Sequence, residues 1–132
     1  MSEAETRAIA RRLMTAICAG DADAVGALYH EDLIGWRNID RRELNRRQML
    51  KIISFLMRGV KDLRYDDIRV EVTARGYVQQ HVLRATAPDG SAIECPACLV
   101  VELAGDRIRR IDEYMDAAAL APLLQPQAQE RN

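Results

Sequence analysis

One acidic residue, Glu113, occupies a position from which a carboxylate could do proton-transfer chemistry. It follows Ile111 by two residues in an alternating segment, so both side chains share one face of a strand. Apolar neighbours desolvate a carboxylate and raise its pKa, which suits a general acid or base. We predict this role for Glu113; the alternative is an exposed Glu113 with Arg110 and Asp112 turned inward.

A histidine and an amide form a second candidate pair on another alternating segment. Gln79, His81 and Leu83 share one strand face, so an amide and an imidazole can be presented to the same ligand. We predict that His81 is the proton-transfer partner of Glu113; if Glu113 is buried beside Ile111 and hydrogen-bonded toward His81, its pKa should be raised. The competing interpretation is structural, because a lone strand histidine is more often a satisfied core residue.

The Cys95-Pro96-Ala97-Cys98 segment has the spacing of a redox pair or half a zinc site, but its context favours neither. Strand-like residues follow it where a redox pair needs a helix, and no second cysteine pair is available for zinc. We expect no metal, and we interpret Cys95 and Ala97 as small residues that leave room in a cavity. The sequence contains no phosphate loop, dinucleotide fingerprint or nucleophile elbow, so no organic cofactor is implied either.

The first half of the chain has helical periodicity. Ser2 and Glu5 form a capping box for a first helix that stops at Gly20, and Asp21 caps a shorter second helix that ends near residues 29–32. We expect a short strand over 33–39, a solvated basic loop over 41–47, and a third helix that ends by Gly59.

The second half alternates with a period of two from Leu63 onward. Turn residues at 75–76, 88–90 and 105–106 separate apolar runs, which predicts four consecutive antiparallel strands and then a last helical turn over 117–124. Helices followed by a strand meander indicate an α+β fold, in which helices cover one face of a curved sheet. The site should lie between the two layers.

The composition is that of one compact domain. The chain has 132 residues, 48% of them hydrophobic and 30% charged, and a net charge of −1. We expect a single domain over 1–124 and a disordered polar tail over 125–132. The charge balance disfavours nucleic-acid binding, and no apolar stretch is long enough to cross a membrane. An acidic N-terminus and three cysteines, an odd number, favour a cytoplasmic protein.

Two segments resemble a known superfamily. The residues from Gly105 to Asp116 form a turn, a strand and an acidic-aromatic ending, and the residues from Ala19 to Asp32 look like paired N-terminal helices. Both resemble the nuclear transport factor 2-like superfamily, and its SnoaL-like branch most. The resemblance implies a cone-shaped α+β barrel, with three N-terminal helices packed on a strongly curved antiparallel sheet, that is usually dimeric. Ketosteroid isomerases, polyketide cyclases, limonene epoxide hydrolases and non-enzymatic binding proteins share this fold.

The resemblance also implies roles for individual residues. Val82-Leu83-Arg84-Ala85 resembles the segment after the catalytic Asp of limonene epoxide hydrolases, which places His81 at that Asp and Gln79 at their Arg. Trp36-Arg37-Asn38 resembles their Tyr-x-Asn, with only the Asn kept. Their Asp-Arg-Asp set is therefore not preserved. Glu113 falls on their second acidic position, where SnoaL-like cyclases also use an acidic residue as acid and base.

These lines converge on a cofactor-independent acid/base enzyme, a lyase, isomerase, cyclase or hydrolase, that acts on a hydrophobic oxygenated small molecule. The alternative is a non-catalytic small-molecule-binding or dimerisation module of the same fold. Glu113 and His81 are the predicted catalytic residues. The predicted substrate-binding residues are Asn38 and Gln79, which orient water or a carbonyl, and the cavity-lining Trp36, Leu83, Cys95, Ala97, Leu99 and Ile111. We also expect a homodimer through the open sheet face, where Val78, Val82 and Val100 lie.

Overall fold

The structure, a computed structural model, describes residues 1–124; the disordered tail predicted for residues 125–132 lies outside them. The helices are α1 (Glu3–Cys18), α2 (Ala22–Leu28), α3 (Arg46–Gly59), the 3-10 turn η1 (Ala117–Leu120) and α4 (Ala121–Leu124). The strands are β1 (Tyr29–Arg37), β2 (Glu43–Asn45), β3 (Lys61–Val72), β4 (Gly76–Thr86), β5 (Ala92–Ala104) and β6 (Arg107–Met115).

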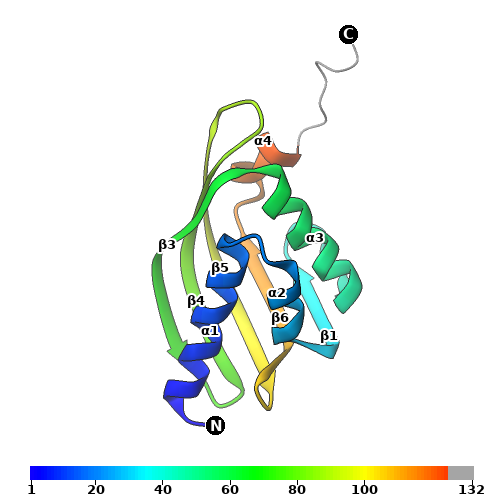
Figure 1. The fold of residues 1–132 in the computed structure, drawn as a ribbon, viewed down its shortest axis with the longest axis vertical. Helices are drawn as coiled ribbons and strands as arrows, with labels where there is room; N and C mark the ends of the chain where they lie inside the picture. Colours follow the sequence, from blue (N-terminus) through cyan, green and yellow to red (C-terminus); the bar gives the residue numbers. More distant parts are fainter. Residues whose placement is uncertain (125–132) are drawn as a thin grey trace.

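The strands form one curled sheet in the order β2-β1-β6-β5-β4-β3. Neighbouring strands are antiparallel except β1 and β6, which are parallel. Figure 1 shows α1, α2 and α3 gathered on one face of this sheet, while η1 and α4 lie at one end of it. The predicted α+β class, with three N-terminal helices on a curved antiparallel sheet, is confirmed.

Local capping explains where two of the helices begin. Ser2 Oγ accepts a hydrogen bond from the Glu5 amide at 3.0 Å, and the Ser2 amide donates to Glu5 Oε1 at 2.8 Å. The predicted capping box of α1 is therefore present. Asn45 and Gln48 form the same reciprocal pair at the start of α3, with both bonds at 2.9 Å. Each box satisfies amide groups that a helix start leaves without partners.

Two boundaries differ from the prediction. The second helix ends at Leu28, and β1 already begins at Tyr29, whereas the strand was predicted only over 33–39. The predicted loop over 41–47 contains β2, which pairs with β1. Tyr29 and Leu33 are both buried, so β1 gains its early start from packing against the core rather than from local sequence.

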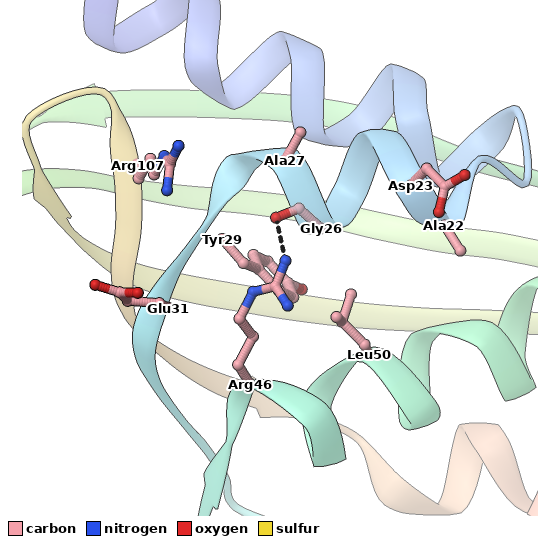
Figure 2. Close-up of a pocket in the computed structure, with 9 residues that line it drawn as sticks. All are labelled: Ala22, Asp23, Gly26, Ala27, Tyr29, Glu31, Arg46, Leu50 and Arg107. Carbon is pink, nitrogen blue, oxygen red and sulfur yellow. Dashed lines mark hydrogen bonds between the residues drawn. The ribbon is translucent and has the colours of Figure 1, made fainter.

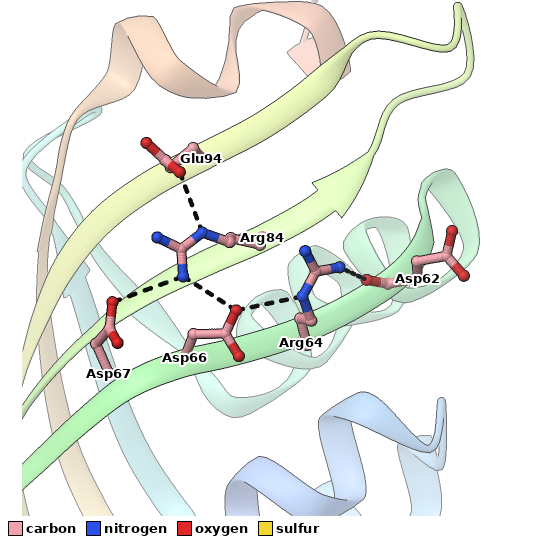
Figure 3. Close-up of polar contacts among 6 residues, drawn as sticks. All are labelled: Asp62, Arg64, Asp66, Asp67, Arg84 and Glu94. Carbon is pink, nitrogen blue, oxygen red and sulfur yellow. Dashed lines mark hydrogen bonds and ion pairs between the residues drawn. The ribbon is translucent and has the colours of Figure 1, made fainter.

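Strand β3 changes register twice along β4. The shifts fall between Lys61 and Arg64 and between Asp66 and Arg69. Asp62 and Asp67 lie inside them, both with a φ of 56°, a left-handed conformation that suits a bulge. On the outer face Arg84 of β4 contacts Asp66 at 3.0 Å, Asp67 at 3.6 Å and Glu94 at 3.1 Å (Figure 3). These ion pairs join β3, β4 and β5 across the second bulge.

The inner face of the sheet carries two apolar clusters. The larger lies under α1, α2 and α3 and includes Leu13, Leu33 and Ile108. The smaller lies at the end closed by η1 and α4, where Leu120 and Leu123 pack. In residues 1–124, no helix combines the length and the apolar character needed to span a lipid bilayer.

Candidate active site

A polar layer, formed by Gln79, His81 and Glu113, lies on the inner face between the two apolar clusters. Along β4, Gln79 and His81 occupy alternate positions between Tyr77 of the larger cluster and Leu83 of the smaller one. Both polar side chains are buried, Gln79 completely and His81 to all but 4%. Burying polar groups costs free energy, so their position inside a core marks a candidate site.

Strand register places Glu113 in the same layer. Leu99 of β5 pairs with Gln79 on one side and with Glu113 on the other, so the three residues form one row across the sheet. Two strand spacings separate Gln79 from Glu113, about 10 Å between backbones. The buried Leu99 side chain lies between them in this row, on the same inner face.

The Glu113 carboxyl group is poorly solvated. It keeps partial solvent access, yet burial raises its pKa to about 7, while the positive charge of Arg37 opposes the shift. Burial together with the Glu113 charge raises the pKa of Tyr29 and Tyr65 above their usual value. Near neutral pH, Glu113 is therefore divided between acid and carboxylate, and these neighbours stay neutral.

The buried histidine is neutral and presents a hydrogen-bond donor. Gln79 Nε2 lies 2.9 Å from His81 Nδ1 and can only donate, so Nδ1 accepts and the ring proton lies on Nε2. Burial lowers the pKa of His81 to about 4. His81 Nε2 and Gln79 Oε1 are both buried without a hydrogen-bond partner in the described structure. The layer therefore offers one donor and one acceptor to a ligand.

Glu113 and His81 form no hydrogen bond with each other among the hydrogen bonds of residues 1–124. His81 Nδ1 is hydrogen-bonded to Gln79. His81 lies two residues along β4 from Gln79, which is the β4 residue in the same row as Glu113. The His81 ring instead packs edge to face with the Tyr65 ring, with centroids 4.7 Å apart. Glu113 and His81 therefore share the inner face of the sheet without a hydrogen bond between them.

Most of the predicted lining residues share the inner face with Glu113. Leu83, Cys95, Leu99 and Ile111 are buried there, and Ala97 is half-buried opposite His81. Cys95 Sγ lies within 3.7 Å of two backbone carbonyl oxygens, those of Pro96 and Asp116, and packs in the smaller cluster. Cys18, Cys95 and Cys98 are all free thiols.

Asn38 is engaged with backbone rather than directed at a ligand. Its Nδ2 donates to the Met115 carbonyl and its Oδ1 accepts from the Met115 amide, both at 3.0 Å. Its own amide donates to the Glu113 carbonyl at 3.0 Å. These bonds form a clamp that ties the end of β1 to β6, and the predicted role of orienting water or a carbonyl stays a prediction.

Trp36 lies on the opposite sheet face, so the structure separates it from the predicted cavity. The preceding residue, Gly35, faces inward, because a Cβ on Gly35 would lie 2.3 Å from Met49 Sδ of α3. Trp36 therefore points outward and packs on Tyr114, with ring centroids 5.3 Å apart. Strand alternation sets this placement, because a tryptophan between two inward residues must face out.

Neither Glu113 nor His81 lines any of five depressions on the surface of residues 1–124. One of about 430 Å³ lies between α2, β1 and the start of α3, where Arg46 donates a 2.7 Å hydrogen bond to the Gly26 carbonyl (Figure 2). Another, of about 200 Å³, lies between α1 and β3 and reaches Gln79. Residues 1–124 bring together no group of three potential metal ligands.

Sequence reasoning missed three residues around Glu113: Arg37, Tyr29 and Tyr65. Arg37 pairs with Glu113 across the parallel β1–β6 contact, and no local sequence pattern predicts this pairing. Tyr65 lies between the two register shifts of β3. Each shift changes which residues face inward, so simple alternation does not predict the face on which Tyr65 lies. The sequence predicts Tyr29 near the end of the second helix, although its aromatic ring next to Leu28 is a signal for burial.

Solved structures with the same architecture come from fungi and bacteria. PrhC from Penicillium brasilianum superposes with a TM-score of 0.82 at 18% identity, over 96% of this chain and 90% of that one. A candidate polyketide cyclase from Xanthomonas campestris pv. campestris gives 0.78 at 18% identity, over 90% and 96%. AclR from Streptomyces galilaeus, a candidate hydroxylase, gives 0.81 at 13% identity, over 91% and 95%.

A family model also matches the sequence directly. No curated protein matches the chain. The model of the SnoaL-like domain matches residues 10–111, which include Gln79 and His81 and stop two residues before Glu113. A match over most of the chain, together with the shared cone fold of the solved structures, establishes that this protein belongs to the SnoaL-like domain family.

Proposed function

We propose that this protein is a cofactor-independent acid/base enzyme that acts on a neutral, hydrophobic, oxygenated small molecule. Glu113 moves the proton, and the polar groups of β4 hold an oxygen of the substrate. An isomerase, a cyclase, a lyase and a hydrolase all fit this chemistry. The observation that carries the proposal is the position of Glu113, a carboxyl group with a pKa of about 7 between two apolar clusters.

The chemistry follows from the protonation states of the layer. At neutral pH a substantial fraction of Glu113 is ionised and can take a proton from a carbon next to a carbonyl group. Negative charge then develops on the carbonyl oxygen, and a donated hydrogen bond stabilises it. His81 Nε2–H is the donor in this proposal, because the neutral imidazole has no free acceptor nitrogen. His81 thus acts as an electrophile rather than as the proton relay that the sequence predicts.

The experiment uses a probe that needs no knowledge of the natural substrate. 2-Tetralone is a neutral, hydrophobic ketone with acidic protons beside its carbonyl group. The wild-type protein in D2O should speed exchange of these protons for deuterium, followed by NMR. Glu113→Gln should lower the protein-catalysed exchange by roughly 10²-fold or more while the fold is kept, because an isosteric amide cannot take up the proton.

Glu102→Gln is the matched control. Glu102 lies on β5, is half-buried and forms an ion pair with the exposed Arg75 at 3.9 Å, so its loss should leave exchange unchanged. Equal exchange by the wild type and Glu113→Gln would remove the catalytic assignment. That result, combined with saturable binding of 2-tetralone, would support the alternative of a non-catalytic binding module. The five surface depressions that bypass Glu113 are the observation that favours this alternative.

A further inference from the structure

We propose that Arg37 and Asp40 together control the charge state of Glu113. In this arrangement Asp40 holds the Arg37 guanidinium group in an ion pair and so withholds it from the neighbouring Glu113 carboxylate. The relevance of this control for catalysis rests on the proposed function, but the control itself does not.

The first support is the register of two parallel strands. Arg37 on β1 and Glu113 on β6 are direct partners, about 4.8 Å apart between backbones. The adjacent pair, Gly35 and Ile111, faces the helices, and alternation puts Arg37 and Glu113 on that same face. A cation is therefore built directly beside the acid of the polar layer.

The second support is the anchoring of this register. The Asn38 clamp holds the end of β1 to Glu113 and Met115 through three hydrogen bonds of 3.0 Å. The next turn is closed by the Arg41 amide, which donates to the Arg37 carbonyl at 2.8 Å. These hydrogen bonds hold the backbone of Arg37 beside Glu113. The conformation of the Arg37 side chain then decides which carboxyl group it contacts.

The third support is the ion pair that the Arg37 side chain forms. Arg37 Nη2 forms an ion pair with Asp40 Oδ2, and the two side chains are only 16% and 23% exposed. No ion pair joins Arg37 to Glu113 among the described residues. Arg37 Nε is buried without a hydrogen-bond partner, so the guanidinium keeps an unused donor. The Arg37 guanidinium group therefore interacts more strongly with the Asp40 carboxylate than with Glu113.

The pKa values of the two acids are consistent with this sharing. Burial opposes ionisation of Asp40, yet the hydrogen bond and charge of Arg37 hold its pKa below the usual range. Burial raises the pKa of Glu113 to about 7, and Arg37 opposes that shift only in part. Burial therefore leaves Glu113 able to hold a proton near neutral pH, while Arg37 is paired with Asp40.

The other polar groups around Glu113 are uncharged. Tyr29 on β1, Tyr65 on β3 and Cys95 on β5 have pKa values raised chiefly by burial, with the Glu113 charge as a smaller cause. His81 on β4 is neutral above about pH 4. Arg37 is therefore the charged side chain that acts on Glu113 within residues 1–124.

The experiment follows the Glu113 carboxyl group directly. In protein labelled with ¹³C at the glutamate side-chain carboxyl, the Glu113 signal is the one that Glu113→Gln removes, and its shift with pH gives the titration midpoint. Asp40→Asn should free Arg37 and lower this midpoint by about one pH unit or more. Arg37→Gln should remove the cation and raise the midpoint, whereas Arg37→Lys should rescue it toward the wild-type value.

The double variant Arg37→Gln with Asp40→Asn tests whether Asp40 acts through Arg37. Without the arginine, Asp40→Asn should lose most of its effect on the Glu113 midpoint. Arg110→Gln is the control, because Arg110 is on β6 but pairs with Glu43 and Asp112 on the other face. Its midpoint should match that of the wild type.

Three results would overturn the proposal. These are an unchanged midpoint in Asp40→Asn, a midpoint that moves in the same direction in Asp40→Asn and Arg37→Gln, and an Asp40→Asn effect that persists in full without Arg37. The titration needs no substrate, so it is independent of the exchange experiment. If the midpoints move as expected while Glu113→Gln leaves 2-tetralone exchange intact, the proposed function fails and the charge control stands.

Discussion

At the scale of single residues, burial drives the acid and the histidine of the polar layer toward the same neutral state. It keeps Glu113 protonated up to about pH 7 and His81 unprotonated down to about pH 4. Between these values the layer carries no net charge from either side chain. A neutral layer suits a neutral ligand, because a charged ligand would enter this space without a counter-charge.

The raised pKa of Glu113 predicts a pH-dependent stability difference between the wild type and Glu113→Gln. Below about pH 4.5 both the folded and the unfolded states hold the proton, so the carboxyl group adds no pH dependence. Between about 4.5 and 7 only the unfolded state releases it, so wild-type stability falls relative to the variant as the pH rises. Urea unfolding should show the variant gaining about 3 kcal/mol on the wild type between pH 4 and pH 8. Parallel stability profiles would contradict the raised pKa.

The tautomer of His81 is a second residue-scale prediction. Because the Gln79 amide donates to Nδ1, nitrogen-15 NMR should show a protonated Nε2 and an unprotonated Nδ1 from pH 8 down to about pH 5. His30 supplies the internal comparison in the same spectra. A proton on Nδ1, or an imidazolium form of His81 at pH 6, would contradict the donor role.

At the scale of elements, local sequence patterns predicted the helices and strands that interactions between nearby residues determine. The Ser2–Glu5 capping box and the alternation after Leu63 predicted α1 and the four strands of the meander. The parallel contact of β1 with β6 escaped prediction, because residues about 75 positions apart in the sequence form it. The short strand β2 was also not predicted, because its pairing with β1, and not its composition, makes it a strand.

The same distinction separates the parts of the site. Alternation alone placed Gln79, His81 and Leu83 on one face of a strand, and it placed Glu113 beside Ile111. It could not say which face of β1 is covered, so Trp36 and Asn38 were assigned to a cavity from resemblance. Burial against α3 decides the question in favour of Gly35 and Arg37.

Asn38 carries the element-scale prediction, because it joins two strands that local sequence does not. Asn38→Ala should remove both side-chain bonds to Met115 and lower the free energy of unfolding by about 1–3 kcal/mol. Urea unfolding measures the loss, and Gln80→Ala, at an exposed outer position of β4, is the control. If Asn38→Ala lowered ligand affinity without loss of stability, Asn38 would be a ligand-binding residue as first predicted.

At the scale of the whole molecule, the sheet has one face covered by helices and one face open. The open face carries exposed apolar side chains, among them Ile34, Val100 and Tyr114. Charged residues surround them, including Arg110 with its ion pairs to Glu43 and Asp112. An apolar centre with a charged rim is the usual composition of a protein–protein interface.

We expect this open face to form a homodimer, because a second copy of the sheet would cover the exposed side chains of both chains. Light scattering at micromolar concentration should give a dimer for the wild type and a monomer for Val100→Glu, which places a carboxylate near the centre of the face. Ile68→Glu is the control: Ile68 is also exposed, but it lines the depression between α1 and β3. A monomeric wild type, or equal dissociation by both variants, would contradict the interface. Because Glu113 lies on the covered face, the Val100→Glu monomer should keep the wild-type titration of Glu113, so assembly and proton transfer can be tested separately.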